Sequence, residues 1–155
     1  MSILLNHAVP DFSVSTTGNR TIQLSELKGK NIVIYFYPKD NTPGCTTEGR
    51  DFKEYYAAFQ LANTTILVVS RDSIKSHENF KTKQQFPFEL VADTDESLCQ
   101  LFDVIKLKKL YGKEYLGIDR STFLIDKTGI LRGIWNNVKV KGHVAEVLQP
   151  AQALD

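Results

Sequence analysis

The sequence predicts an α/β fold with a central mixed β-sheet, helices on both faces of the sheet, and an N-terminal β-hairpin. Two observations carry this prediction. Segments with strand character alternate with segments of helical character along the chain. The two most apolar strands, residues 31–37 and 64–70, have no polar face, which is typical of strands covered by helices on both sides. A thioredoxin-like layout is one arrangement of this kind.

The strands are identified by their apolar pattern. Residues 10–24 are predicted to be two short strands around a turn at Gly18, because apolar side chains on the two sides match each other. Residues 31–37 and 64–70 are rich in β-branched and aromatic residues and are predicted to be buried strands. A short strand is expected at residues 88–91.

Helical segments separate these strands. Residues 43–62 are predicted to be a helix because aromatic side chains recur at helical spacing and form one apolar stripe. The members of this stripe are Phe52, Tyr55, Tyr56 and Phe59. Three further helices are expected, at residues 73–84, 95–103 and 142–149.

The segment after the third helix is harder to assign. Residues 106–119 are basic and contain glycine, and we expect a loop there. Residues 121–126 and 130–137 are predicted to form a hairpin that turns at Gly129.

Composition and charge narrow the class of protein. The chain has 155 residues, so we expect one domain over residues 1–155 that buries its core without disulfides. The net charge of +1 argues against a nucleic-acid or membrane-surface partner. No apolar run could span a bilayer, and the N-terminus lacks a signal-peptide pattern. The two cysteines do not form a secreted disulfide scaffold, so we expect a reducing, cytoplasmic setting.

Metal chemistry is not indicated. His7, His77 and His143 have no metal-ligand spacing with either cysteine, so no metal site is expected. A phosphate-binding glycine motif is also absent from the sequence.

Residues 38–45 carry the most information about function. The strand at 31–37 ends at Pro38, a short turn follows, and Thr42-Pro43 is typical of a helix start. Cys45 is therefore predicted in the first turn of a helix. The helix dipole and the unpaired N–H groups there favour the thiolate, which is the nucleophilic form of cysteine.

The neighbours of Cys45 each allow two interpretations. Thr42 could cap the helix, donate a hydrogen bond to the thiolate or to a substrate oxygen, or do both. Pro38 could shield the sulfur or simply end the strand. Gly44 could permit a close approach or merely a turn.

A buried thiolate also needs a fixed positive charge. Arg120 directly precedes the apolar strand at 121–126, and its guanidinium keeps its charge. Glu48 could orient such a cation. On pattern alone, a solvated surface position is the simpler interpretation of Arg120.

These residues also carry a family resemblance. The run from Pro38 to Cys45 has the spacing Pro-x-x-x-Thr-x-x-Cys and resembles the peroxiredoxin active-site motif. Residues 115–126, Tyr-x-Gly-Ile-x-Arg-Ser-Thr-Phe-Leu-Ile-Asp, are similar to the bacterioferritin comigratory protein branch, also called PrxQ. Residues 8–12 and 24–30 match that branch too, so the resemblance covers nearly the whole chain.

The resemblance implies a thioredoxin-like fold and a thiol peroxidase without metal, haem or flavin that serves antioxidant defence. Cys45 would reduce hydrogen peroxide and organic hydroperoxides and become a sulfenic acid. Thr42 and Arg120 would hold the peroxide oxygens together with the backbone at Gly44, and Pro38 would shield the sulfur.

The chain departs from that branch at the second cysteine. Many members carry a resolving cysteine five residues after the first, where this chain has Arg50. The other thiol here, Cys99, is more simply a small core residue than a resolving cysteine. We therefore expect a one-cysteine cycle that uses an external thiol (thioredoxin, glutaredoxin or glutathione). The resemblance also favours a monomer.

Two other functions compete with peroxide turnover. The same fold could support thiol–disulfide exchange, but the site lacks the second cysteine of a Cys-x-x-Cys motif. Cys45 could also act as a peroxide sensor, whose oxidation signals to partner proteins.

Overall fold

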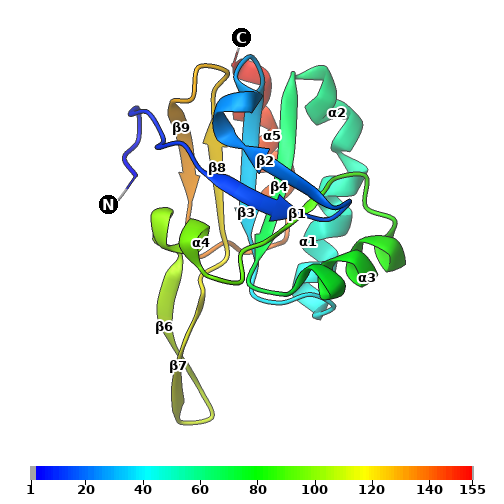
Figure 1. The fold of residues 1–155 in the computed structure, drawn as a ribbon, viewed down its shortest axis with the longest axis vertical. Helices are drawn as coiled ribbons and strands as arrows, with labels where there is room; N and C mark the ends of the chain where they lie inside the picture. The colour runs from blue at the N-terminus through cyan, green and yellow to red at the C-terminus, as the bar shows by residue number, and fades with distance from the viewer. Residues whose placement is uncertain (1–2, 155) are drawn as a thin grey trace.

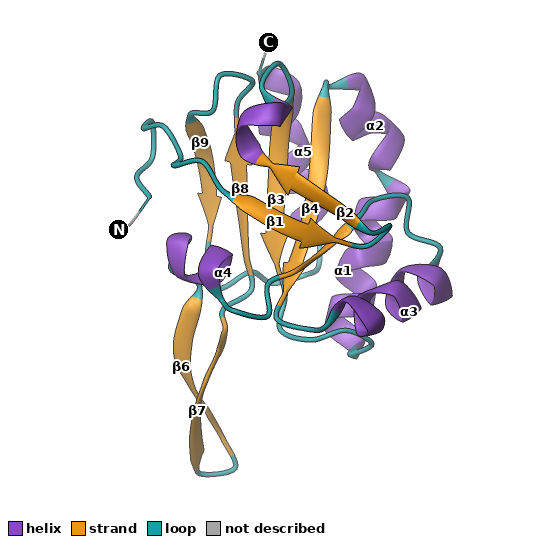
Figure 2. Ribbon diagram, viewed as in Figure 1, coloured by secondary structure: helices purple, strands orange, loops and turns teal. Residues whose placement is uncertain are grey.

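The computed structural model describes residues 3–154, and its central feature is a seven-stranded mixed sheet (Figures 1 and 2). The strand order is β2-β1-β5-β4-β3-β8-β9. The strands are β1 (Ser13–Thr16), β2 (Arg20–Gln23), β3 (Asn31–Phe36), β4 (Thr64–Ser70), β5 (Leu90–Ala92), β8 (Ser121–Ile125) and β9 (Leu131–Trp135). The neighbours β3, β4 and β5 run parallel, and the other pairs run antiparallel. The predicted α/β class, mixed sheet and N-terminal hairpin are confirmed.

Helices cover both faces of the sheet. They are α1 (Pro43–Glu54), α2 (Tyr56–Leu61), α3 (Ile74–Gln84), α4 (Ser97–Leu101) and α5 (His143–Ala153), with a 3₁₀ helix at Leu24–Leu27. Val33 and Tyr35 of β3 pack in a core with residues of α1, α2, α3 and α5. Ile34 and Phe36 alternate with them and pack in a second core with α4 and the N-terminal segment. Among residues 3–154, no helix is long and apolar enough to cross a membrane.

Two predicted helix boundaries are wrong. The segment at 43–62 is two helices, because the backbone of Tyr55, with φ of −92° and ψ of 7°, leaves the helical conformation. The last helix runs to Ala153 rather than ending before Pro150. Proline removes one backbone donor, but the buried side chain of Ala151 holds the final turn against the core.

The prediction of a loop at residues 106–119 is also wrong. This segment forms a two-stranded hairpin of β6 (Ile105–Leu110) and β7 (Lys113–Ile118), which projects from the body of the molecule (Figure 1). Apolar residues alternate with lysines over the first four residues of β6, Ile105 to Lys108, so the charges hide a strand pattern. The turn at Tyr111 and Gly112 has positive φ at both residues, as a tight hairpin turn requires.

The pairing of β3 with β8 brings together the segment that follows β3 and the residue that precedes β8. The strands are antiparallel, and Phe36 at the end of β3 lies opposite Ser121 at the start of β8. The loop that follows β3 and the residue that precedes β8 therefore meet at the same edge of the sheet. The loop leads into the first turn of α1, which contains Cys45, and the residue before β8 is Arg120.

We expect Gly49→Ala to destabilise the protein. Gly49 is buried in α1, and a Cβ there would lie 2.5 Å from Cζ of Phe86. Because both α1 and the Phe86 ring are packed, the substitution should lower the free energy of unfolding by about 1–3 kcal/mol. Urea unfolding measures this change. Arg50→Ala, at the next and exposed position of the same helix, is the control. Equal stabilities of the two variants would contradict this packing.

Candidate active site

Cys45 lies in the first turn of α1, as the sequence predicts. Thr42 is the N-cap residue, Pro43 is the first helical residue, and the N–H of Thr46 donates to the carbonyl of Thr42. Cys45 is only 2% exposed and packs in the core with Val33 and its neighbours. The sulfur is thus held at a helix N-terminus and shielded from bulk water.

Arg120 reaches this sulfur from the start of β8. Its Nη2 donates to Sγ of Cys45 at 3.2 Å, and its Nη1 donates to Oε1 of Glu48 at 2.6 Å. Burial lowers the pKa of Arg120, but Glu48 and Cys45 more than offset this and raise it above its ordinary value. The guanidinium therefore stays cationic and places a positive charge beside the sulfur of Cys45.

Glu48 is buried completely beneath the guanidinium. Burial raises the pKa of its carboxyl to about 7, although Arg120 pulls the value down. Oε1 takes the ion pair, while Oε2 has no hydrogen-bond partner among the described residues. Glu48 therefore orients Arg120 and is close to gaining a proton near neutral pH.

Thr42 does not cap the helix with its side chain. Its hydroxyl donates to the carbonyl of Lys39 at 2.8 Å, and the structure shows no side-chain cap bond. The hydroxyl therefore fastens the turn before α1. Pro38 lies half-buried at the start of the same turn.

Gly44 leaves room for the cation. A Cβ at Gly44 would lie 3.2 Å from Nη2 of Arg120, tighter than an ordinary contact. The side-chain-free position therefore allows the guanidinium to approach the sulfur.

Cys99 lies away from these residues. It is fully buried in the core formed with Ile34 and Phe36, whereas Cys45 packs in the core on the other face of the sheet. Burial raises the pKa of its thiol well above the ordinary range, and Asp93 raises it further. The sheet thus separates the two sulfur atoms, and Cys99 is held as a neutral thiol.

A buried polar cluster that is not predicted from the sequence lies at the loop before Cys45. Oη of Tyr37 donates to Oδ1 of Asp40 at 2.5 Å, and Nδ1 of His77 lies 2.7 Å from Oδ2 of Asp40. Nε2 of His77 lies 2.9 Å from the carbonyl oxygen of Val91. A signal was available, because His77 falls three residues before Phe80 and so shares the inward face of its helix.

This cluster resembles a metal site only by proximity. Ligand atoms of Asp40, Asp72 and His77 lie within 4.8 Å of one another. Both ring nitrogens of His77 already face hydrogen-bond acceptors, and Oδ2 of Asp72 accepts from Ser70 and from the backbone of Asp40. These residues therefore satisfy one another and do not offer a cation an open set of lone pairs.

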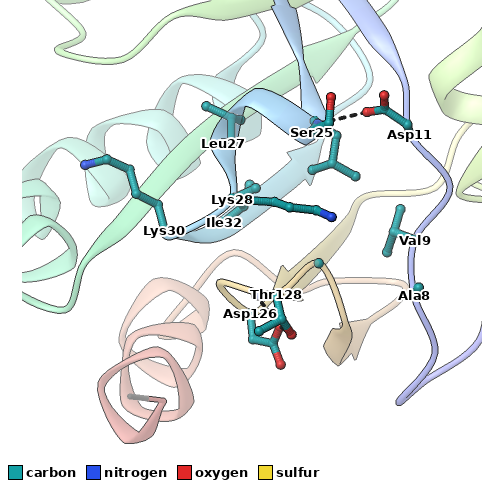
Figure 3. A pocket seen from close by; sticks show the side chains of 12 residues that line it. Ala8, Val9, Asp11, Ser25, Leu27, Lys28, Lys30, Ile32, Asp126 and Thr128 are labelled. Atoms are coloured by element: carbon teal, nitrogen blue, oxygen red, sulfur yellow. Dashed lines mark hydrogen bonds between the residues drawn. The ribbon is translucent and has the colours of Figure 1, made fainter.

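A separate cavity of about 210 Å³ lies at the far end of β3 from Cys45. Figure 3 shows Lys28 extending between Ile32 and Val9, with Asp126 on another wall. No residue of the loop at 38–45 lines this cavity. It is therefore distinct from the cysteine site.

Proteins with similar sequences belong to one known family. Residues 5–134 match the model of the AhpC/TSA family. The chain is 51% identical over 149 residues to peroxiredoxin Bcp of Bacillus subtilis, covering 96% of this chain and 95% of that protein. It is 52% identical over 143 residues to peroxiredoxin Bcp of Xanthomonas campestris, covering 92% and 89%.

Solved structures show the same likeness. The bacterioferritin comigratory protein of Xanthomonas campestris superposes with a TM-score of 0.88 at 51% identity, covering 92% of this chain and 90% of that one. A cysteine-to-serine mutant of PrxQ from Xylella fastidiosa gives a TM-score of 0.92 at 43% identity, covering 97% and 96%. The fold is therefore the thioredoxin-like fold of the peroxiredoxins. The chain belongs to the AhpC/TSA family and, within it, to the Bcp/PrxQ peroxiredoxins, which are thiol peroxidases.

Proposed function

We propose that Cys45 is the peroxidatic cysteine of this peroxidase. The observation that carries the proposal is the hydrogen bond from Arg120 to Sγ, in the first turn of α1. The thiolate attacks one oxygen of a hydroperoxide, so that an S–O bond forms as the O–O bond breaks. Cys45 becomes a sulfenic acid, and the second oxygen takes up a proton and leaves as water or an alcohol.

The surrounding groups stabilise the charge that moves during this step. Arg120 lies where negative charge passes from sulfur to oxygen, and positioned donors of this kind supply much of an enzyme's rate enhancement. We propose that Thr42 and the backbone at Gly44 hold the peroxide, that Pro38 shields the sulfur, and that Glu48 aims Arg120. The sulfur supplies both electrons, so the step needs no cofactor.

Hydrogen peroxide and organic hydroperoxides are the proposed substrates. The solved relative from Xanthomonas campestris is described by its alkyl peroxide reduction activity, which supports the organic class. We further propose that the chain acts as a single-domain monomer in the cytoplasm.

We propose that an external thiol returns the sulfenic acid to the thiol. Cys45 and Cys99 pack in cores on opposite faces of the sheet, and a disulfide requires Cα atoms less than about 7 Å apart. Thioredoxin, glutaredoxin or glutathione would supply the external thiol.

Replacing Arg120 should slow peroxide attack. Arg120→Ala removes the donor to Sγ, and we expect the second-order rate of Cys45 oxidation to fall by about 100-fold. Stopped-flow measurement with hydrogen peroxide gives this rate. Arg132→Ala is the matched control, since Arg132 pairs with Asp126 at the far end of the sheet. An unchanged rate in Arg120→Ala would remove Arg120 from the mechanism.

Replacing Cys99 separates the one-cysteine cycle from an internal disulfide. We expect Cys99→Ser to retain full turnover with an external thiol, because Cys99 is buried on the opposite face from Cys45. Steady-state peroxide consumption measures this. If turnover stopped while the first oxidation stayed rapid, Cys99 would be the resolving residue.

Glu48 should make the stability of the protein depend on pH. The pKa of Glu48 rises from 4.5 to about 7 on folding, so between these values the folded protein retains a proton that the unfolded chain has lost. This contribution to stability is present at low pH and is lost as the pH rises through 7. Glu48→Gln removes the titration, so its stability relative to the native protein should increase over this range by at most about 3 kcal/mol.

Urea unfolding at about pH 4 and about pH 8 brackets this titration. Glu54→Gln, an exposed position later in α1, is the control and should follow the native protein. A constant stability difference between Glu48→Gln and the native protein would contradict the raised pKa.

A further inference from the structure

Asp40 anchors the loop that leads to Cys45. Its carboxylate is buried and accepts from Tyr37 at 2.5 Å, from Oγ of Ser76 at 2.8 Å and from His77 at 2.7 Å. Its backbone N–H donates to Oδ2 of Asp72 at 2.9 Å. One residue of the loop is thus tied to the end of β3, to the segment after β4 and to α3.

Both nitrogens of the His77 ring have hydrogen-bond partners. Nε2 lies 2.9 Å from the carbonyl oxygen of Val91, which can only accept, so Nε2 carries a hydrogen. Nδ1 lies 2.7 Å from Oδ2 of Asp40, whose carboxyl group also accepts from the hydroxyl groups of Tyr37 and Ser76. His77 and Asp40 therefore form a buried hydrogen-bonded pair, and both side chains are at most 1% exposed.

Few other side-chain bonds fasten this part of the chain. The hydroxyl of Thr42 bonds within its own turn to Lys39, and the hydroxyl of Thr47 bonds within α1 to Pro43. Two residues link residues 38–48 to the rest of the described structure through side-chain hydrogen bonds. They are Asp40 and Arg120.

Because Cys45 is buried, the loop that Asp40 anchors controls access to the sulfur. Cys45 is 2% exposed. A hydroperoxide is small, but the thiol of a reducing molecule must bring its own sulfur into line with Sγ. The loop must therefore open for the second half of the cycle and close for the first half. A buried polar group that loses its hydrogen-bond partner costs free energy, so the Asp40–His77 pair resists opening.

We propose that the buried Asp40–His77 pair is a latch that holds the loop at 38–42 closed and sets how often Cys45 opens to an external thiol. The latch rests on the proposed function of Cys45. Asp40 and His77 are positioning residues, since neither touches the sulfur. Weakening the latch should help large reagents reach Cys45 more than it helps peroxide.

His77→Gln is the direct test, because glutamine is similar in size but lacks the two opposed ring nitrogens that contact Asp40 and Val91. Two rates are measured at Cys45: labelling of the reduced protein by a maleimide on a polyethylene glycol chain, and oxidation by hydrogen peroxide. We expect the ratio of labelling to oxidation to rise by about tenfold in His77→Gln. Reduction of the Cys45 sulfenic acid by glutathione, in a single turnover, should accelerate in parallel.

Two more variants keep the test decisive. Ser76→Ala removes one donor to Asp40 but leaves its contact with His77, so its ratio should rise by less, and it serves if His77→Gln does not fold. Asp126→Asn is the matched control, because Asp126 is a buried carboxylate that fastens a turn to Thr128 and Arg132 at the far end of the sheet. Its loss should destabilise the protein without changing the ratio.

The outcomes separate this proposal from general destabilisation. A ratio that is unchanged in His77→Gln, or that rises equally in Asp126→Asn, would overturn the latch. If the native protein showed no rapid oxidation by peroxide, the proposed function would fail. The maleimide rate alone would then still decide whether the pair closes the loop.

Discussion

The positive charge of Arg120 is shared between two buried groups, the sulfur of Cys45 and the carboxylate of Glu48, and the surrounding structure depends on that contact. The guanidinium lies 3.2 Å from Sγ and 2.6 Å from Oε1. A buried cation is stable only when it is paired, and a buried carboxylate has the same requirement. Cys45 and Glu48 lie one turn apart on α1, and both contact Arg120. The three side chains therefore fix one another's positions. Gly44 permits this approach because it has no side chain.

The central sheet gives the two cysteines different environments. Strands apolar on both faces separate two cores, and each core contains one thiol. Cys45 is at a helix N-terminus beside the cationic Arg120. Cys99 is in an apolar environment beside Asp93, where the neutral thiol is stabilised. Two residues of the same type thus have different electrostatic surroundings because of their position relative to one sheet.

Local features of the site could be predicted from the sequence, whereas long-range features could not. The strand that ends at Pro38 and the helix that begins at Pro43 are encoded by adjacent residues, so the position of Cys45 in the first helical turn was predictable. The contact with Arg120 depends on the antiparallel pairing of β3 with β8, which the local pattern does not specify. Only the resemblance to the peroxiredoxins indicated that contact.

Other features were missed for identifiable reasons. The hairpin of β6 and β7 is predicted as a loop because lysines occupy three of the six positions of β6. The Asp40–His77 pair could not be predicted because its burial and its contact with a carbonyl from β5 arise only when distant segments pack. The break at Tyr55 also lies inside a continuous apolar stripe that a pattern analysis cannot divide.

The most direct test of the central claim is the intact mass of the reduced protein within seconds of adding one equivalent of hydrogen peroxide. An activated Cys45 predicts a rapid gain of one oxygen atom that is absent in Cys45→Ser. A rapid loss of two hydrogens would instead show an internal disulfide and contradict the one-cysteine cycle. An unchanged mass would mean that Arg120 and the helix N-terminus do not activate this sulfur, and the account of the site would be wrong.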